Sequence, residues 1–417
     1  MTRHLVRLIW NRKRQNLLLT VEIFCSFLVV FVVALVGLTY AVNARQSLGF
    51  DIDRVWVIDV GRPRGPIGET DKAATAAREA AEREVFTRLL AALRELPQVE
   101  RASGSFTGPY VNSTWGSGAR LTDGRQIDFL YNRVTDDFTR LLSMPIVAGR
   151  TFSREDDAAA DDPVLINAAM ARVVFGDADP IGKIIPQKPD PQRPPDRPAD
   201  KPKRVVGVIE DFRQHGVYST PGNVLFDRLR IDVPDHGVPD RLLIRVTPGT
   251  SAAFEPILIR RLQRESADWS FDVSTMDKLR EQSVKTYTIP LAVLAVLAGF
   301  LLLMVMLGLS GVVWQSVTQR LREFGLRRAA GASGLSVRRQ VQVEMAVMTT
   351  FALIVGIALV AQIPFLPRPR ELVLVPGVFV AAVALSAAAI YCLTLACGWY
   401  PSRLASRIPP ADALRYE

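Results

Sequence analysis

Long uncharged apolar segments constrain the fold of this chain more than any other feature. Residues 17–42 contain the run FCSFLVVFVVALVGL, residues 286–319 carry no charge, and two further apolar segments occupy 345–363 and 372–398. A helix that crosses a membrane needs about 20 apolar residues. The sequence therefore predicts an α-helical membrane protein with four transmembrane helices.

Two of these segments carry additional information. At a rise of 1.5 Å per residue, a helix over 286–319 reaches about 50 Å, and a hydrocarbon core is only about 30 Å thick. The second helix should therefore project beyond the membrane as a stalk. The first segment exceeds the roughly 7–15 apolar residues of a signal peptide. A transmembrane helix is thus favoured there over a cleaved leader, which is the alternative.

The residues between the first and second spans, 45–285, predict a large α+β domain outside the cytoplasm. Nearly half of the chain is hydrophobic (49%), yet 22% is charged, which fits a membrane anchor joined to a water-exposed domain. The segment 186–203 is rich in proline and charge and predicts an exposed, disordered loop. The expected strands are 55–60, 125–133, 163–166, 204–209, 223–226 and 241–246, and the expected helices are 72–96, 136–143, 168–175 and 251–265.

The net charge of +9 indicates membrane topology and not nucleic-acid binding, because much of the excess lies beside the apolar segments. Anionic membrane lipid is the nearest partner for such charge. Four spans place both termini and the segment between spans two and three on one face, which the basic residues identify as cytoplasmic. The basic residues concerned are Arg3, Arg7, Arg12, Lys13, Arg14, Arg403, Arg407 and Arg415, together with those of residues 320–339.

Residues 320–339 predict a short basic helical elbow. Helix formers occupy 317–330, Gly331 can end that helix, and 335–343 starts another. Arginines dominate the elbow, and Glu323 is its single acid. The expected divisions of the chain are an amphipathic lead-in helix (1–16), the first span (17–44), the outer domain (45–285), the second span with its stalk (286–316), the elbow (317–342), spans three (343–366) and four (372–398), and a cytoplasmic tail (399–417).

The sequence contains few candidates for catalysis or metal binding. The histidines are His4, His215 and His236, with no cysteine near them and no GxSxG motif for a hydrolase. Gly182 and Lys183 fail the spacing of a phosphate-binding loop. No enzymatic activity, metal or cofactor is therefore expected for this chain.

Three cysteines and the acid Glu22 lie inside predicted spans. Cys25, Cys392 and Cys397 are expected to act as small apolar residues, which leaves the outer domain without disulfides. Glu22 lies near the cytoplasmic start of the first span. An interfacial pairing with arginine is favoured over a proton site.

Several motifs resemble the MacB/FtsX-like permeases of ABC transporters. The resemblance extends over essentially the whole chain, and it includes the order of spans and outer domain. It is carried by REFGLRRA (322–329) in the elbow, PSRLASRIPPADALRYE (401–417) at the end, and MPIVAGRTFSREDD (144–157), INAAMARVVFGDADPIGKII (166–185) and VVGVIEDFR (205–213) in the outer domain.

The resemblance implies a stand-alone permease subunit that is not itself catalytic. A separate ABC ATPase dimer would bind ATP and magnesium, and a second permease copy or paralogue, and in some systems a periplasmic adaptor, would complete the complex in the bacterial inner membrane. The elbow would dock on the ATPase. The implied coupling residues are Glu323, Phe324, Gly325, Leu326, Arg327 and Arg328.

The function implied by this resemblance is transmission of ATP-driven motion to the outer domain. Export or efflux of a peptide, antibiotic or lipid-linked cargo is the leading expectation. Lipoprotein release from the inner membrane is one alternative. An FtsX-like role in signalling, which regulates cell-wall hydrolases without moving cargo, is another. Ala168, where the family often has an acid, and the apparent insertion at 186–203 depart from the family pattern.

Overall fold

The computed structural model describes residues 13–63, 72–111, 116–187, 201–320, 326, 333–366 and 375–405. The chain divides into two compact units. We call the unit made of residues up to Val42 and from Tyr287 onward the membrane unit, and we call Asn43–Thr286 the outer domain.

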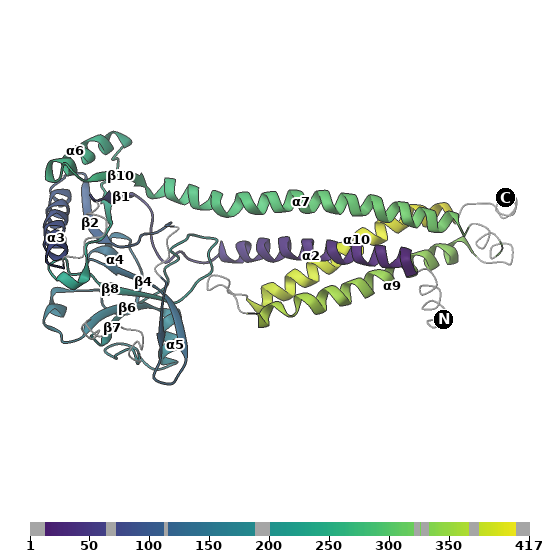
Figure 1. The fold of residues 1–417 in the computed structure, drawn as a ribbon, viewed down its shortest axis with the longest axis horizontal. Helices are drawn as coiled ribbons and strands as arrows, with labels where there is room; N and C mark the ends of the chain where they lie inside the picture. Colours follow the sequence, from purple (N-terminus) through teal and green to yellow (C-terminus); the bar gives the residue numbers. More distant parts are fainter. Residues whose placement is uncertain are drawn as a thin grey trace. The chain divides into compact units, whose positions relative to one another are not determined.

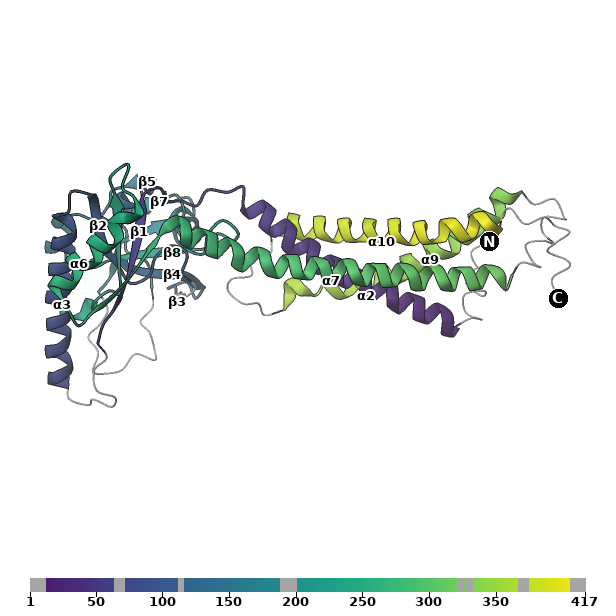
Figure 2. The same cartoon turned by 90° about the horizontal axis from the view of Figure 1, so that it is seen from above.

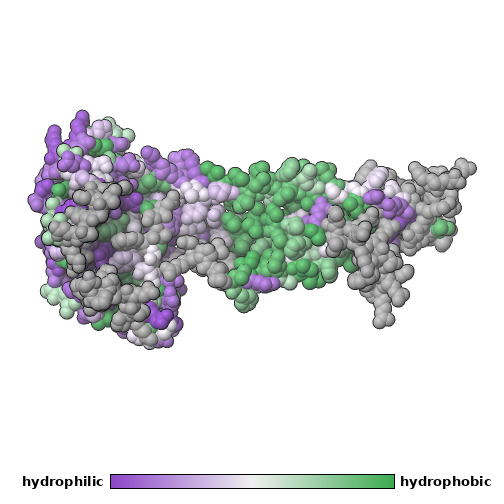
Figure 3. Space-filling view, viewed as in Figure 1, coloured by the Kyte–Doolittle hydropathy of each residue, from purple (hydrophilic) through white to green (hydrophobic). Residues whose placement is uncertain are grey.

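Long apolar helices build the membrane unit (Figure 1). They are α2 (Lys13–Asn43), α7 (Met276–Thr318), α9 (Gly334–Val360) and α10 (Pro376–Ala405), and a short 3₁₀ turn, η4 (Ile363–Phe365), follows α9. The described residues contain four helices that are long and apolar enough to cross a membrane. Figure 3 shows their side chains as a broad hydrophobic band on the membrane unit.

Buried stripes hold the four helices together. On α2 the stripe recurs every four residues, from Leu19 to Ile23, Phe27 and Phe31, as one face of a helix requires. Gly356 of α9 allows close packing, because a Cβ added there would lie 2.5 Å from Cδ1 of Phe27. The cysteines Cys25, Cys392 and Cys397 are free and lie on these helices, as predicted.

The helix α7 is longer than a membrane span requires. Its 43 residues continue through Pro290 without a break, and Met276–Thr286 belong to the outer domain by the division above. At 1.5 Å per residue such a helix is about 65 Å long. The predicted stalk is therefore part of one uninterrupted helix that contains residues of both units.

A mixed ten-stranded sheet forms the outer domain, and its order is β10-β1-β9-β2-β4-β8-β6-β7-β5, with β3 paired to β4. Parallel pairs join β4 to β8 and β6 to β7. The strands are β1 (Val55–Gly61), β2 (Val99–Ser105), β3 (Gly116–Arg120), β4 (Gln126–Val134), β5 (Ile146–Gly149), β6 (Asp162–Asn167), β7 (Lys203–Ile209), β8 (Val224–Arg228), β9 (Arg241–Val246) and β10 (Ser270–Thr275).

Helices cover the sheet because its strands are apolar on both faces. Along β1, Trp56 and Ile58 pack in one cluster with α3 (Lys72–Arg94) and α6 (Glu255–Glu265), whereas Val55 and Val57 pack in another. Figure 2 shows α3 and α6 close together beside β1 and β2. The remaining elements are α4 (Phe138–Leu141), α5 (Ala168–Phe175) and the 3₁₀ turns η1 (Arg154–Ala158), η2 (Pro234–His236) and η3 (Ala252–Phe254).

The predicted strands and helices of the outer domain are confirmed, with small shifts in their ends. Helix α5 has the predicted bounds, and Asn167 caps it by accepting a hydrogen bond from the Met170 amide. Four strands were not predicted: β2, β3, β5 and β10. In β2 the small residue Gly104 lies against Phe86, since an added Cβ would be 2.8 Å from that ring. Because glycine and serine are small or polar, the sequence of β2 does not indicate that these positions are buried.

The predicted helix over 317–330 is wrong at residues 319–320. Helix α7 ends at Thr318, and Gln319 and Arg320 form a turn. The following helix is confirmed: α9 begins at Gly334, and the Ser333 side chain accepts from the Ser336 amide. Most of the lead-in helix (1–12), the core of the loop 186–203 (188–200) and the end of the tail (406–417) lie outside the described residues.

Candidate coupling site

An ion pair ties the C-terminal end of α7 to α9. Arg320 follows the end of α7, and its Nη1 donates to both carboxylate oxygens of Glu344, at 3.1 and 2.9 Å. The two side chains are only 11% and 17% exposed. Gln340 Nε2 also donates to Glu344, at 3.3 Å. The first residue of the basic segment 320–339 is thus held to α9.

Of the predicted coupling residues, the structure describes Leu326, whose side chain is 57% exposed. Glu344 was not predicted from the sequence, although it is an acid directly before an apolar run and near a basic segment. The predicted residues outside the described part of the chain are Glu323, Phe324, Gly325, Arg327 and Arg328.

At the other end of α7, within the outer domain, one loop contacts both helices that lead to the membrane unit. We call residues 213–220 the junction loop. Ser283 of α7 donates its hydroxyl to the His215 carbonyl oxygen at 2.8 Å. Asn43, the last residue of α2, donates Nδ2 to the Tyr218 carbonyl oxygen at 3.0 Å. The end of α2 and the start of α7 are therefore joined through this loop.

Arg213 is the centre of this junction and is only 2% exposed. Its Nη1 donates to the carbonyl oxygens of Asn43, at 2.7 Å, and Gln46, at 3.2 Å. Its Nε donates to the Ser219 carbonyl oxygen at 3.2 Å, and Nη2 donates to those of Val217 and Ser219. A planar guanidinium, which has several fixed donors, can bind several carbonyl oxygens at once better than an ammonium group can. Arg213 thereby fixes the chain that leaves α2 against the junction loop.

Tyr110, which packs against the junction loop, is held in an unfavourable state. Tyr110 has a φ of 62°, which is costly for a residue with a side chain. Its hydroxyl is buried and has no hydrogen-bond partner among the described residues, and burial raises its pKa to about 12. Gly216 packs on it: φ is +92°, and an added Cβ would lie 2.7 Å from the Tyr110 ring. Strained backbone of this kind gathers at functional sites.

A separate charged network braces the sheet of the outer domain. Asp227 on β8 is 4% exposed and accepts from the Tyr131 hydroxyl at 2.6 Å and from Lys203 Nζ at 2.9 Å. Arg133 Nε lies 3.6 Å from the same oxygen. Burial by itself raises the pKa of Asp227, but Lys203, Tyr131 and Arg133 outweigh it and keep this pKa below its usual value.

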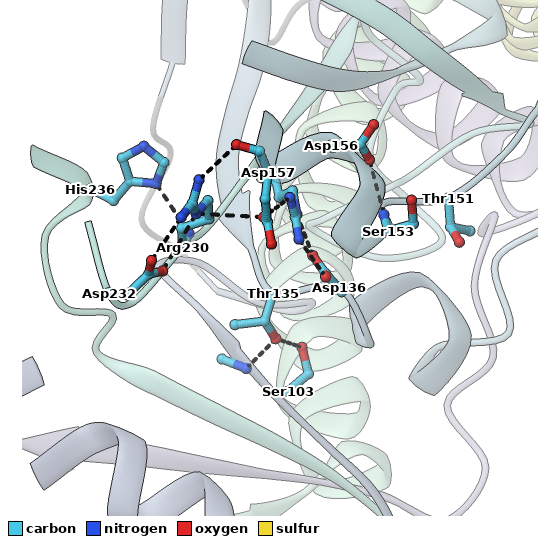
Figure 4. A network of polar contacts seen from close by, with 12 residues as sticks. Ser103, Thr135, Asp136, Thr151, Ser153, Asp156, Asp157, Arg230, Asp232 and His236 are labelled. Carbon is cyan, nitrogen blue, oxygen red and sulfur yellow. Dashed lines mark hydrogen bonds and ion pairs between the residues drawn. The ribbon is translucent and has the colours of Figure 1, made fainter. Parts of the chain in front are cut away.

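His236 lies beside this network and takes part in a second set of contacts, shown in Figure 4. Its Nδ1 accepts from the Arg230 amide at 3.1 Å, so Nδ1 carries no proton. The Arg230 side chain contacts Asp232 at 2.8 Å and Asp157 at 3.7 Å. Burial, followed by the charge of Arg133, lowers the pKa of His236.

This depressed pKa predicts that the outer domain loses stability in mild acid. The unfolded chain protonates His236 near pH 6.5, whereas the folded protein does so only at lower pH. Between these values the unfolded state binds more protons than the folded state. The free energy of unfolding therefore decreases as the pH is lowered, by at most about 1.4 kcal/mol per pH unit. His236→Gln should flatten this part of the profile, and His4→Gln should not. Urea unfolding of the full chain between pH 5 and pH 8 measures both; equal slopes for both variants would contradict the assignment.

The outer domain also contains a cavity of about 560 Å³, where the end of β1 and the starts of β9 and β10 meet. Both apolar side chains and carboxylates line the cavity. Thr107 is 5% exposed, and its hydroxyl has no hydrogen-bond partner among the described residues. The lining residues are Asp59, Val60, Gly61, Phe106, Thr107, Val111, Asp240, Arg241, Ser270, Phe271 and Asp272.

The spans and the inserted domain define a class of protein: a multi-pass membrane protein whose α/β domain lies between its first and second transmembrane helices. Two family models match the chain. One, described as MacB-like periplasmic core domain, matches residues 26–255, and the other, described as FtsX-like permease C-terminal, matches residues 295–410. The chain belongs to the family of MacB/FtsX-like ABC transporter permeases, and its outer domain is extracytoplasmic.

Individual proteins similar to this chain are permeases or ATP-binding/permease proteins of the same kind. The chain is 27% identical over 299 residues to the macrolide export ATP-binding/permease protein MacB of Chromobacterium violaceum, a match that covers 67% of this chain and 42% of that protein. It is 24% identical over 315 residues to the uncharacterized ABC transporter permease YknZ of Bacillus subtilis, over 70% of this chain and 71% of that protein. The chain thus spans less than half the length of the MacB relatives it matches.

Among solved structures, the periplasmic region of MacB from Actinobacillus actinomycetemcomitans matches 57% of this chain and 96% of that chain. The TM-score is 0.36 and the sequence identity is 11%. The family assignment rests on the family models and not on this superposition.

Proposed function

We propose that this chain is the permease subunit that transmits ATP-driven motion from a separate ABC ATPase dimer to the extracytoplasmic domain. The elbow, both termini and the ATPase would lie in the cytoplasm of a bacterial cell, with the chain in the inner membrane. A second permease copy or paralogue would complete the complex. The motion would serve export of a peptide, antibiotic or lipid-linked cargo.

The observation that carries this proposal is the continuity of α7. Its inner end is fixed to α9 through Arg320 and Glu344 beside the elbow, and its outer end is fixed through Ser283 to the junction loop. A continuous helix with both ends held can pass a displacement along its axis. The strained Tyr110 and the buried Arg213 lie where that displacement would enter the outer domain.

Cargo would contact the outer domain at the cavity of about 560 Å³. Phe106 and Phe271 offer apolar surface there, and Asp272 offers negative charge. Cavities of roughly this size, with apolar walls and a few polar groups, are typical of sites for small organic molecules. This arrangement favours cargo that carries both apolar groups and positive charge.

The test is co-purification with an ATPase. We expect the wild-type chain, co-expressed with candidate ABC ATPases and purified in nanodiscs, to retain one of them. Glu323→Ala/Arg327→Ala should lose the ATPase or lower its turnover at least about tenfold, as removal of central interface contacts does. Arg172→Ala, which removes an exposed arginine of α5 in the outer domain, is the control and should leave both unchanged.

Failure of the wild-type chain to retain any ATPase, under conditions where related permeases hold theirs, would contradict the proposal. The alternatives give different results with the same complex. An exporter should show turnover stimulated by cargo, and a lipoprotein-release permease should be stimulated by lipoprotein. A regulator of cell-wall hydrolases should bind a hydrolase through the outer domain and move no cargo.

A further inference from the structure

A surface cavity opens between α9 and α10 at the end of the membrane unit that lies next to the elbow. Its volume is about 580 Å³, and its lining residues are Arg338, Gln342, Leu395, Ala396 and Trp399. Trp399 is the last residue of the candidate span Pro376–Trp399, and Arg338 lies in the first turns of α9. Tryptophan at the end of a span marks the interface between hydrocarbon and headgroups. The cavity therefore lies at headgroup depth.

Two guanidinium groups lie near the Trp399 indole, which lines this cavity together with Arg338; Arg403 lies beside it. The Arg338 and Arg403 guanidinium carbons lie 5.4 and 5.5 Å from the centre of the Trp399 ring. Each contact is a favourable cation–π interaction, but together they place two positive charges near each other. Among the described residues, no carboxylate forms an ion pair with Arg338. A bound anion close to both guanidinium groups would offset their repulsion.

The rest of the cavity is apolar. Leu395 and Trp399 are 40% and 49% exposed, and Ala396 lies between them in the sequence. Gln342 contributes its amide, which donates to the Leu395 carbonyl oxygen at 3.4 Å. The surface thus has a positively charged end and an apolar wall formed by Leu395, Ala396 and Trp399 of α10. That polarity matches a molecule with an anionic head and a hydrocarbon chain.

We propose that this cavity is a binding site for one anionic phospholipid. Its phosphate lies against Arg338 and Arg403, and an acyl chain lies along Leu395 and Ala396. Guanidinium groups bind phosphate by charge-assisted hydrogen bonds, and basic residues beside a span attract anionic headgroups. The lipid would brace α9 against α10 immediately after the elbow. This inference does not depend on the proposed function.

The test compares how well lipid is retained by variants at two adjacent arginines. The full chain is purified in detergent, exchanged into an equimolar mixture of phosphatidylglycerol and phosphatidylcholine, and examined by native mass spectrometry. We expect the wild type to retain phosphatidylglycerol preferentially. Arg338→Gln should weaken that retention about fivefold, the effect of one basic residue at an anionic surface. Arg339→Gln removes the same charge from the next position, about 100° around the helix, and should have no effect.

Two further experiments distinguish a bound lipid from a soluble phosphate ester. Trp399→Leu should weaken retention as well, because it removes the ring against which both arginines pack. Added glycerophosphoglycerol, which has the headgroup without acyl chains, should not displace the lipid. Displacement by that compound would show a site for soluble phosphate esters and overturn the lipid assignment.

Two other results would also overturn the proposal. One is equal retention of phosphatidylglycerol by Arg338→Gln and Arg339→Gln. The other is equal retention of the two lipids by the wild-type chain. Circular dichroism and elution volume check that each variant keeps its helical content and remains monodisperse, so that loss of lipid is read only from folded protein.

Discussion

Arg213→Ala should destabilise the outer domain by about 3–5 kcal/mol. The substitution leaves the carbonyl oxygens of Asn43, Gln46 and Ser219 without their donor, and each unpaired buried group costs about 1–3 kcal/mol. It also leaves a cavity in place of a fully buried side chain. Urea unfolding of the full chain in nanodiscs measures the loss. Hydrogen exchange should report it first at residues 43–46 and 217–219.

Two variants make this prediction specific. Arg213→Lys keeps the charge but loses the planar fork of donors, so we expect an intermediate loss of about 1–3 kcal/mol. Arg172→Ala removes an exposed arginine of α5 and should change stability by less than about 0.5 kcal/mol. If Arg213→Ala unfolds at the same urea concentration as Arg172→Ala, Arg213 does not hold the junction. On the proposed function, Arg213→Lys should also retain the ATPase while its response to cargo weakens.

Asp227→Ala should destabilise the outer domain by about 3 kcal/mol, because it removes a buried carboxylate and leaves the partly buried Lys203 and Arg133 without their shared partner. The pKa of Asp227 is depressed in the folded protein. Its contribution is therefore fully present above the unfolded pKa of about 3.9 and is lost as pH falls through the lower folded value. Urea unfolding of the full chain at neutral and acid pH measures both effects.

The matched control for Asp227 is Asp161, the residue immediately before β6. Asp161 pairs with Arg204, whose side chain is 46% exposed, so Asp161→Ala should cost no more than about 1 kcal/mol. A double variant, Asp227→Asn/Lys203→Met, should recover part of the loss, since it removes the uncompensated cation together with the acid. Equal costs for Asp227→Ala and Asp161→Ala would show that the buried network contributes nothing beyond a surface ion pair.

Local patterns predicted much of this fold. The four spans follow from apolar runs whose lengths alone match a bilayer. Helix α5 and strands such as β1 and β9 follow from short periodic segments with capping or turn residues around them. The strands that escaped prediction, such as β2 with Gly104 and Ser105, have small or polar residues whose burial depends on Phe86 and Asn132 from other elements. A strand such as β2 therefore lacks the alternation of apolar residues from which a buried strand is predicted.

The candidate sites were predicted less well. The elbow was predicted from its charge and its resemblance to a family, and all of its coupling residues remain a prediction. Glu344 could have been suspected, since it is the acid beside a basic segment. Arg213 could not, because an arginine after VVGVIEDF has no local feature that distinguishes it from an exposed one. Its partner Asn43 is 170 residues away along the chain.

The sequence by itself determined the membrane spans, the placement of the outer domain between the first two, and the family. These properties depend on runs and motifs of neighbouring residues, whose hydrophobicity and periodicity act locally. Only the tertiary structure decided that Arg213 is buried at the exit of α2 and that Asp227 is surrounded by Lys203, Tyr131 and Arg133. It also decided that Arg338 and Arg403 share Trp399. Burial and pairing of charges depend on which distant segments the fold brings together, and only those contacts offset the cost of removing a charge from water.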